Sequence, residues 1–262
     1  MEPIYLSISD FFIKITFIEG EFPFSRVISR NIQHIYSGFV VSDPKRIDYE
    51  IEIIQRKKID TLSYKKTKNY IVIYERMSMT KIRTYYYISG LQFRLILRDI
   101  IIELLEKQNG FMIHASAIVH NKFAYLFVGK SGIGKSTIAS LLENKYQVLA
   151  DDSGILKQKN GYYYFYQSIL SEKKNIYKDS CHYSLGGIFF LKQRQQCVLK
   201  KINNKETILA HLLKQLWGMQ NNISSNQMRN LTNFVNKNNL FYNLGFNTNI
   251  LDILRVIKPI FR

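Results

Sequence analysis

The sequence predicts an α/β fold in which a β-rich region, residues 1–89, precedes a larger domain, residues 90–262, that mixes strands with helices. Three observations support this prediction. Apolar and polar residues alternate over the first third of the chain, a pattern typical of half-buried strands. A glycine-rich segment, residues 129–137, lies between an apolar run and a helical pattern. Strand and helix patterns then continue to the end of the chain.

The first region contains runs with a period of two residues, which we interpret as strands and which include 11–18, 49–55, 70–75 and 81–88. Residues 91–107 follow and are apolar over most of a helical circumference. Asp99, Glu103 and Lys107 recur there at four-residue spacing. This pattern predicts a largely buried helix that ends near Gly110 and joins the two regions.

The second region begins with an apolar strand, 111–119, which a turn at His120 and Asn121 joins to a second strand, 122–128. A helix at 138–143 and a short buried strand at 146–150 are expected next. Trp217 and Phe234 are expected in the core. The remaining expected elements are, in order, strands at 162–166, 187–191 and 197–201, helices at 205–218 and 226–236, and a final strand at 241–246 followed by a helix.

Residues 129–136 match the phosphate-binding pattern G-x-x-x-x-G-K-[ST] at every fixed position. Its glycines allow backbone angles closed to other residues, so that successive N–H groups can approach phosphate oxygens at a helix N-terminus. A glycine-rich turn without a ligand is the alternative, and the flanking strand and helix argue against it. The nucleotide contacts expected from this P-loop are Gly129, Ser131, Gly132, Ile133, Gly134, Lys135, Ser136 and Thr137.

Two of these side chains have chemical roles of their own. Lys135 supplies a mobile positive charge for the β- and γ-phosphates of ATP, and the Ser136 hydroxyl is a suitable ligand for Mg²⁺. Asp151 and Asp152 follow the strand expected at 146–150, where one carboxylate can bind Mg²⁺ and the other can accept a proton. Asp151 and Asp152 could instead form only a polar turn.

His114 is the single histidine of the apolar run 111–119 and could face the phosphates. A lone histidine in such a strand is more often a hydrogen-bonded core residue, so the local sequence favours that alternative.

The order of these features resembles the HPr kinase/phosphorylase family: His114, then GKSGIGKST, then LADD ending at Asp152. The fold of that family is similar to the nucleotide domain of phosphoenolpyruvate carboxykinase. With residues 185–191, LGGIFFL, the chain looks closer to HPr-kinase-related proteins of peptide-tailoring gene sets, including kinases of a lasso-peptide precursor serine. The resemblance implies a phosphate-side role for His114, phosphate binding by Lys135, metal binding by Ser136 and Asp152, and base and Mg²⁺ roles shared by Asp151 and Asp152.

Two departures narrow the expected activity. The glycine-rich C-terminal signature associated with phosphorolysis has no counterpart, so the resemblance implies a kinase without the reverse reaction. Residues 167–175 lack the Pro-aromatic segment of the tailoring relatives, which leaves the shape of the acceptor site open.

The composition of the chain argues against several classes of protein. The chain of 262 residues is 46% hydrophobic, enough for a full core, and has neither a long uncharged apolar run nor a basic-then-apolar signal segment, so we expect a cytoplasmic protein that does not span a membrane. The two cysteines, Cys181 and Cys197, fit a reducing compartment. The net charge of +17 allows binding to polyanions, but the lysines are dispersed, and we favour a solvated basic surface over a nucleic-acid site.

The leading hypothesis is an ATP- and Mg²⁺-dependent kinase whose partner is a peptide or protein with an acceptor serine. The alternative is a nucleotide-gated binding module that transfers no phosphoryl group. A nucleic-acid ATPase ranks last because charge alone suggests it. The sequence is also compatible with a homo-oligomer and does not identify the acceptor.

Overall fold

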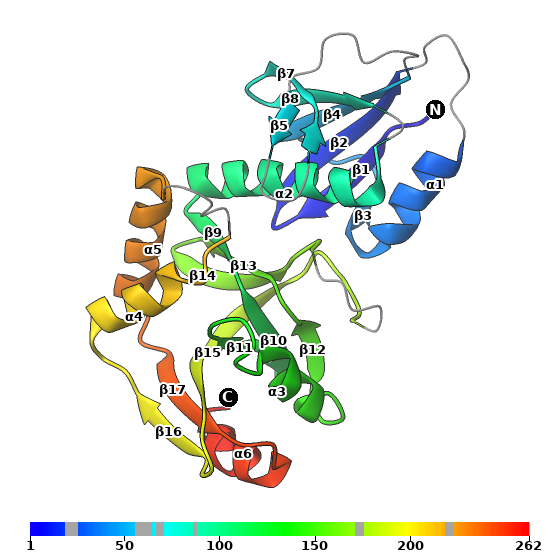
Figure 1. The fold of residues 1–262 in the computed structure, drawn as a ribbon. Helices are drawn as coiled ribbons and strands as arrows, with labels where there is room; N and C mark the ends of the chain where they lie inside the picture. The colour runs from blue at the N-terminus through cyan, green and yellow to red at the C-terminus, as the bar shows by residue number, and fades with distance from the viewer. Residues whose placement is uncertain are drawn as a thin grey trace. The chain divides into compact units, whose positions relative to one another are not determined.

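The computed structural model describes residues 1–18, 26–55, 64–66, 71–85, 88–170, 176–217 and 223–261 (Figure 1). The chain divides into two compact units, and the division falls inside one long helix. The first unit comprises Met1–Ile101 with Lys178–Ser180, and the second comprises Ile102–Tyr177 with Cys181–Arg262.

The first unit is built on a six-stranded sheet with the order β3-β1-β2-β4-β8-β7, beside a separate β5-β6 pair. Its first helix was not expected from the sequence. Its elements are β1 (Ile4–Ile8), β2 (Phe11–Ile18), α1 (Arg26–Ile35), a 3-10 turn (Ser37–Phe39), β3 (Val40–Val41), β4 (Tyr49–Ile54), β5 (Tyr64–Lys66), β6 (Ile71–Ile73), β7 (Glu75–Ser78), β8 (Lys81–Tyr85) and the first part of α2 (Gly90–Lys107).

The apolar and polar alternation of β2 corresponds to an alternation in burial. Every second residue of β2 is buried, and the residues between are partly exposed. On the other side of the sheet, the Glu52 carboxylate of β4 is buried and accepts hydrogen bonds from Arg83 of β8 at 2.8 and 3.0 Å. Pairs of opposite charge on neighbouring strands stabilise a sheet. The strand expected at 11–18 is therefore confirmed, whereas Tyr70, Tyr86 and Tyr87 of other expected strands lie outside the described residues.

The second unit contains a nine-stranded sheet with the main order β12-β10-β11-β15-β14-β13-β9, and β17 lies between β15 and β16. Its strands are β9 (Gly110–Ile113), β10 (Ala115–His120), β11 (Phe123–Val128), β12 (Gln147–Ala150), β13 (Gly154–Lys159), β14 (Tyr162–Gln167), β15 (His182–Gln193), β16 (Val198–Lys201) and β17 (Phe241–Phe246). Its helices are α3 (Lys135–Leu142), α4 (Lys205–Leu213), α5 (Ser225–Lys237) and α6 (Ile250–Ile257), followed by a 3-10 turn (Lys258–Ile260).

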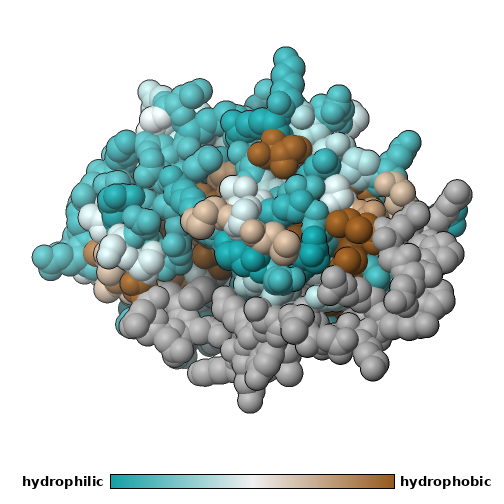
Figure 2. Space-filling view, turned by 90° about the horizontal axis from the view of Figure 1, so that it is seen from above, coloured by the Kyte–Doolittle hydropathy of each residue, from teal (hydrophilic) through white to brown (hydrophobic). Residues whose placement is uncertain are grey.

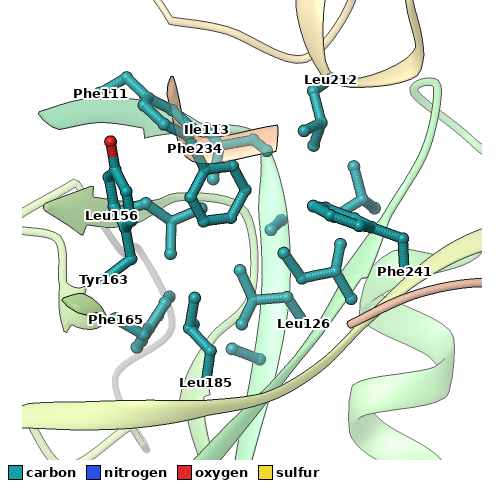
Figure 3. Packing of buried hydrophobic residues seen from close by; sticks show 14 of the residues in the cluster. Phe111, Ile113, Leu126, Leu156, Tyr163, Phe165, Leu185, Leu212, Phe234 and Phe241 are labelled. Atoms are coloured by element: carbon teal, nitrogen blue, oxygen red, sulfur yellow. The ribbon is translucent and has the colours of Figure 1, made fainter. Parts of the chain in front are cut away.

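The central strands of this sheet are buried on both faces. Leu126 of β11 packs in one hydrophobic cluster with Leu212 of α4 and Phe234 of α5 (Figure 3). The neighbouring Phe127 points to the opposite face and packs in a second cluster with residues of α3 and α6, including Ile138. A strand that is covered on both faces needs apolar residues at every position. This explains why the sequence of β11 is continuously apolar.

Side chains at the helix ends fix where three helices of this unit begin. The Asn204 side chain accepts a hydrogen bond from the Thr207 amide at 2.7 Å at the start of α4, and Asn249 caps α6. Ser224 and Gln227 form a capping box at the start of α5. α4 and α5 pack over the same face of the sheet through their buried apolar residues.

The structure corrects the single strand expected at 111–119. The run breaks at His114, where β9 pairs with β13 and β10 pairs with β11 and β12. β9 lies at one end of the strand order and β10 lies near the other, yet only His114 separates them along the chain. The sheet therefore curls, and its two ends meet at this histidine.

The helix expected at 205–218 is also shorter, because α4 ends at Leu213, and Gly218 lies outside the described residues. Trp217 is half-buried and not a core residue, whereas Phe234 is fully buried as expected.

Hydrophilic residues dominate the face of the molecule in Figure 2, with hydrophobic residues interspersed among them. None of the helices in the described part of the chain combines the length and apolar character that a membrane span requires.

Candidate functional site

The candidate site lies at the carboxyl ends of parallel strands in the second unit. β11 runs parallel to β15, with Val128 opposite Phe190, and β15 runs parallel to β17. Residues 129–134, which we call the glycine loop, connect the end of β11 to α3. The side-chain amide of Gln193, the last residue of β15, donates to the Ile133 carbonyl at 3.3 Å and so connects the loop to the adjacent strand. Open α/β sheets bind ligands at such edges.

Two glycines give the loop its shape. Gly132 has φ of 77° and Gly134 has φ of 108°, in the left-handed region that other residues rarely adopt. A Cβ atom at Gly134 would lie 2.7 Å from Cζ of Phe246, whereas one at Gly132 would meet no atom of the described residues within 4 Å. No side chain of the described residues caps the start of α3, which leaves its first N–H groups for a ligand. The opening at Gly132 and these uncapped amides fit an anionic group.

We expect Gly134→Ala to destabilise the fold by about 2–3 kcal/mol, because strain at positive φ adds to a clash with the buried Phe246 ring. Gly161→Ala is the matched control: Gly161 has φ of 85°, but no atom of the described residues lies within 4 Å of its added Cβ, so only the backbone strain remains. Urea unfolding of both variants measures the difference. Equal destabilisation would contradict the role of Phe246.

Lys135 begins α3 and is buried under the loop that it follows. Its Nζ donates to the Gly129 carbonyl at 2.9 Å and to the Lys130 carbonyl at 3.4 Å. Burial lowers the pKa of Lys135, and the nearby charge of Asp152 opposes that shift. The ammonium group is thus held against the loop without a direct ion pair among the described residues.

The other polar side chains of the phosphate-binding motif are exposed to solvent, unlike that of Lys135. Ser131, Ser136 and Thr137 are exposed, and the Ser136 hydroxyl donates to the Asp151 carbonyl at 3.4 Å. Sequence reasoning missed Ser116 of β10, whose buried hydroxyl donates to the Lys135 carbonyl at 2.8 Å. Ser116 connects the start of α3 to the sheet, and a single serine in an apolar run gives no warning of that contact.

The two aspartates at the end of β12 differ in exposure. Asp151 is buried, whereas the Asp152 side chain is 59% exposed. Oδ1 of Asp152 lies 3.7 Å from Nδ1 of His114. The His114 imidazole lowers the pKa of Asp152, the charge of Lys135 acts in the same direction, and burial opposes both. The pKa of the Asp152 carboxyl group is therefore influenced by both His114 and Lys135.

His114 is held by its backbone and its ring. Its amide donates to the Gln215 carbonyl at 2.7 Å, and the next amide, of Ala115, donates to the Asp152 carbonyl at 3.2 Å. Its ring stacks on Trp217 with centroids 4.0 Å apart, and 36% of the side chain is exposed. His114 is thus not a core residue. Gln215 and Trp217, which the sequence did not suggest, position it from a segment far along the chain.

The donor set bears on which metal could bind. Within the described ranges, no three His, Cys, Asp or Glu side chains come together as metal ligands. Ser136 and the two aspartates offer only oxygen atoms. Mg²⁺ is commonly held by one or two carboxylates and the phosphates of a nucleotide, so this sparse oxygen set fits Mg²⁺ better than a protein-enclosed metal.

Comparison with known protein families gives one match that covers more than half of the chain. The family described as SynChlorMet cassette protein ScmC matches residues 90–241. The chain belongs to the ScmC family. The ScmC match includes His114, the glycine loop, Lys135 and both aspartates, and it begins at the first residue of α2.

The chain is also similar to a solved structure. The HPr(Ser) kinase/phosphatase from Coxiella burnetii is 16% identical, and the similarity covers 35% of this chain and 72% of that one with a TM-score of 0.26. A search of curated proteins found no match.

Proposed function

We propose that this protein is an ATP-dependent kinase that transfers the γ-phosphoryl group to a hydroxyl, with a peptide or protein serine as acceptor. One observation carries the proposal: three strand ends of one sheet bring together a phosphate-binding sequence pattern, its lysine and a paired histidine and aspartate. We further propose that the glycine loop acts as a P-loop of the HPr kinase type and that the protein works in the cytoplasm.

The proposed roles follow from charge and position. The loop amides and the Lys135 ammonium bind and orient the β- and γ-phosphates, for which Lys135 must leave the Gly129 and Lys130 carbonyls. Ser136 and Asp152 would hold Mg²⁺, which supplies charge neutralisation to the triphosphate when bound. Ser116 fixes the start of α3 and thereby the position of Lys135.

In the proposed transfer, the acceptor oxygen forms a bond to the γ-phosphorus while the bond from that phosphorus to the β–γ bridging oxygen breaks. ADP leaves with the electron pair of the broken bond. The acceptor proton passes to an aspartate carboxylate, either Asp152 at the exposed edge or Asp151 beside it. His114, held by Gln215 and Trp217, orients Asp152 and keeps it ionised.

We expect His114→Gln to lower turnover about ten- to a thousandfold with little change in nucleotide affinity, because His114 acts on Asp152 and not on the loop. His120→Gln is the matched control, since His120 is also half-buried and lies at the other end of β10. Single-turnover assays at saturating ATP and thermal melts of both variants measure the effect. A lowered melting temperature with full activity in the folded fraction would reject a catalytic role.

The proposed acceptor is a serine of a ribosomal natural-product precursor peptide. The description of the ScmC family as a cassette protein supports a role beside other products of one biosynthetic gene set. The sequence resemblance to kinases of lasso-peptide precursors supports the same class of acceptor.

The test is incubation with ATP, Mg²⁺ and serine peptides, followed by mass spectrometry for an added phosphate, with serine-to-alanine peptides as controls. Transfer to the serine peptide alone is expected. ATP binding without transfer would indicate a nucleotide-gated binding module instead. Absence of ATP binding would reject the site assignment.

A further inference from the structure

A cavity of about 630 Å³ opens beside the glycine loop in the second unit and is lined by five cationic side chains. They come from the loop, the end of β15, β16 and the residue after α4. We call this site the basic cavity, and its cations are Lys130, Lys192, Arg194, Lys200 and Lys214. Among the described residues, no aspartate or glutamate lines it.

These five cations have no counter-charge in the described part of the chain, where none of them forms an ion pair or a side-chain hydrogen bond. The aliphatic stem of Arg194 packs over Gly245, where an added Cβ would lie 2.7 Å from its Cδ. Burial and the nearby Lys214 charge both lower the pKa of His211 at the cavity wall. Clustered like charges repel one another, and a bound anion relieves that repulsion.

The remainder of the lining is largely apolar. Val128, Phe190, Leu191 and Val198 contribute to it, and the His211 ring stacks on Phe190 with centroids 4.9 Å apart. A purely polyanionic ligand would leave this surface without a partner. The lining instead fits a ligand that combines negative charge with carbon-rich segments, as an acidic peptide does.

The basic cavity shares residues with the candidate site. The carbonyls of Gly129 and Lys130, which hold Lys135, belong to residues that line it. Gln215 also lines it and accepts the backbone hydrogen bond of His114. The basic cavity is therefore adjacent to the candidate site, and a peptide that occupied both would place its hydroxyl toward Asp152 and its neighbouring residues in the cavity.

We infer that the basic cavity binds carboxylate side chains that flank the acceptor serine, so that the kinase selects acidic peptides. This inference rests on the proposed function. In the proposed function, Lys135 and the loop amides bind the triphosphate. Five further cations therefore exceed what ATP requires.

Two labelled probes test the inference by fluorescence anisotropy at about 0.15 M salt: a serine peptide flanked by glutamates, and the same peptide with glutamines. The cavity variant is Lys192→Gln/Arg194→Gln/Lys200→Gln. The matched control, Lys145→Gln/Lys237→Gln/Lys258→Gln, removes the same charge from exposed lysines elsewhere in this unit. We expect the cavity variant to weaken glutamate-peptide binding about tenfold, and the control to change it less than about twofold because salt screens distant charges.

Other outcomes would overturn the inference. Equal loss in both variants, or equal binding of both peptides, would indicate only a diffuse basic surface. Loss of ATP affinity in the cavity variant would assign the cavity to the nucleotide, and preferential displacement by a thymidine oligonucleotide would assign it to nucleic acid. Because binding is measured without turnover, selective binding with no phosphate transfer would reject the kinase proposal and leave the acidic-peptide site standing.

Discussion

Lys135→Ala is expected to reduce ATP turnover about a hundred- to a thousandfold, the range typical of losing one preorganised group that stabilises transition-state charge. Lys135 is the buried ammonium of the candidate site, and its bonds to the Gly129 and Lys130 carbonyls keep it on the loop. The cations of the basic cavity cannot replace it, because they line a neighbouring space. Alanine also leaves those two carbonyls without this donor, so part of the effect will appear as lower stability.

The measurement is single-turnover ATP hydrolysis and peptide transfer, together with a thermal melt. Lys145→Ala is the matched control because Lys145 is exposed just beyond the other end of α3. We expect its rates to equal those of the unmodified protein. Unchanged rates in a folded Lys135→Ala variant would remove the glycine loop from the proposed mechanism.

Local sequence patterns predict the strands and helices of this protein best where burial is periodic or continuous. β2 and β17 have the bounds expected from the sequence, and α2 begins one residue earlier than expected. β13 was missed although Asn160 and Gly161 form a two-residue turn with positive φ at both positions, a recognised hairpin signal. The turn was therefore recognisable from the sequence, but β13 was not predicted because its second half is polar.

The break at His114 could not be predicted from the local sequence, because the run around it is apolar on both sides and contains no glycine or proline. A hydrogen bond to Gln215 and the curl of the sheet decide it, and both depend on residues remote in the chain. The basic cavity is hidden for the same reason. Its lysines look dispersed along the sequence, as solvated surface lysines do, and only the fold brings Lys130, Lys200 and Lys214 to one space.

The remaining large effect concerns the aspartates. Asp152→Asn is expected to lower phosphoryl transfer about a hundred- to ten-thousandfold, and Asp151→Asn is expected to lower it as well, because asparagine can neither accept the proton nor neutralise the metal. We expect only one of the two variants to show a markedly altered Mg²⁺ dependence. Magnesium titrations of single-turnover rates separate the two roles, and activity equal to that of the unmodified protein in both variants would mean that the aspartates form only a turn.

The pH dependence gives an independent test of Asp152. The pKa of Asp152 is lowered by His114 and Lys135, so its carboxylate stays ionised as the pH falls through the ordinary aspartate value of about 4. Transfer that needs the ionised form is therefore lost only below that pH. His114→Gln removes the main cause of the shift, so the acid limb of the residual activity should move to higher pH, with circular dichroism confirming that the protein stays folded. An acid limb at the same pH in both proteins would show that His114 does not act through Asp152.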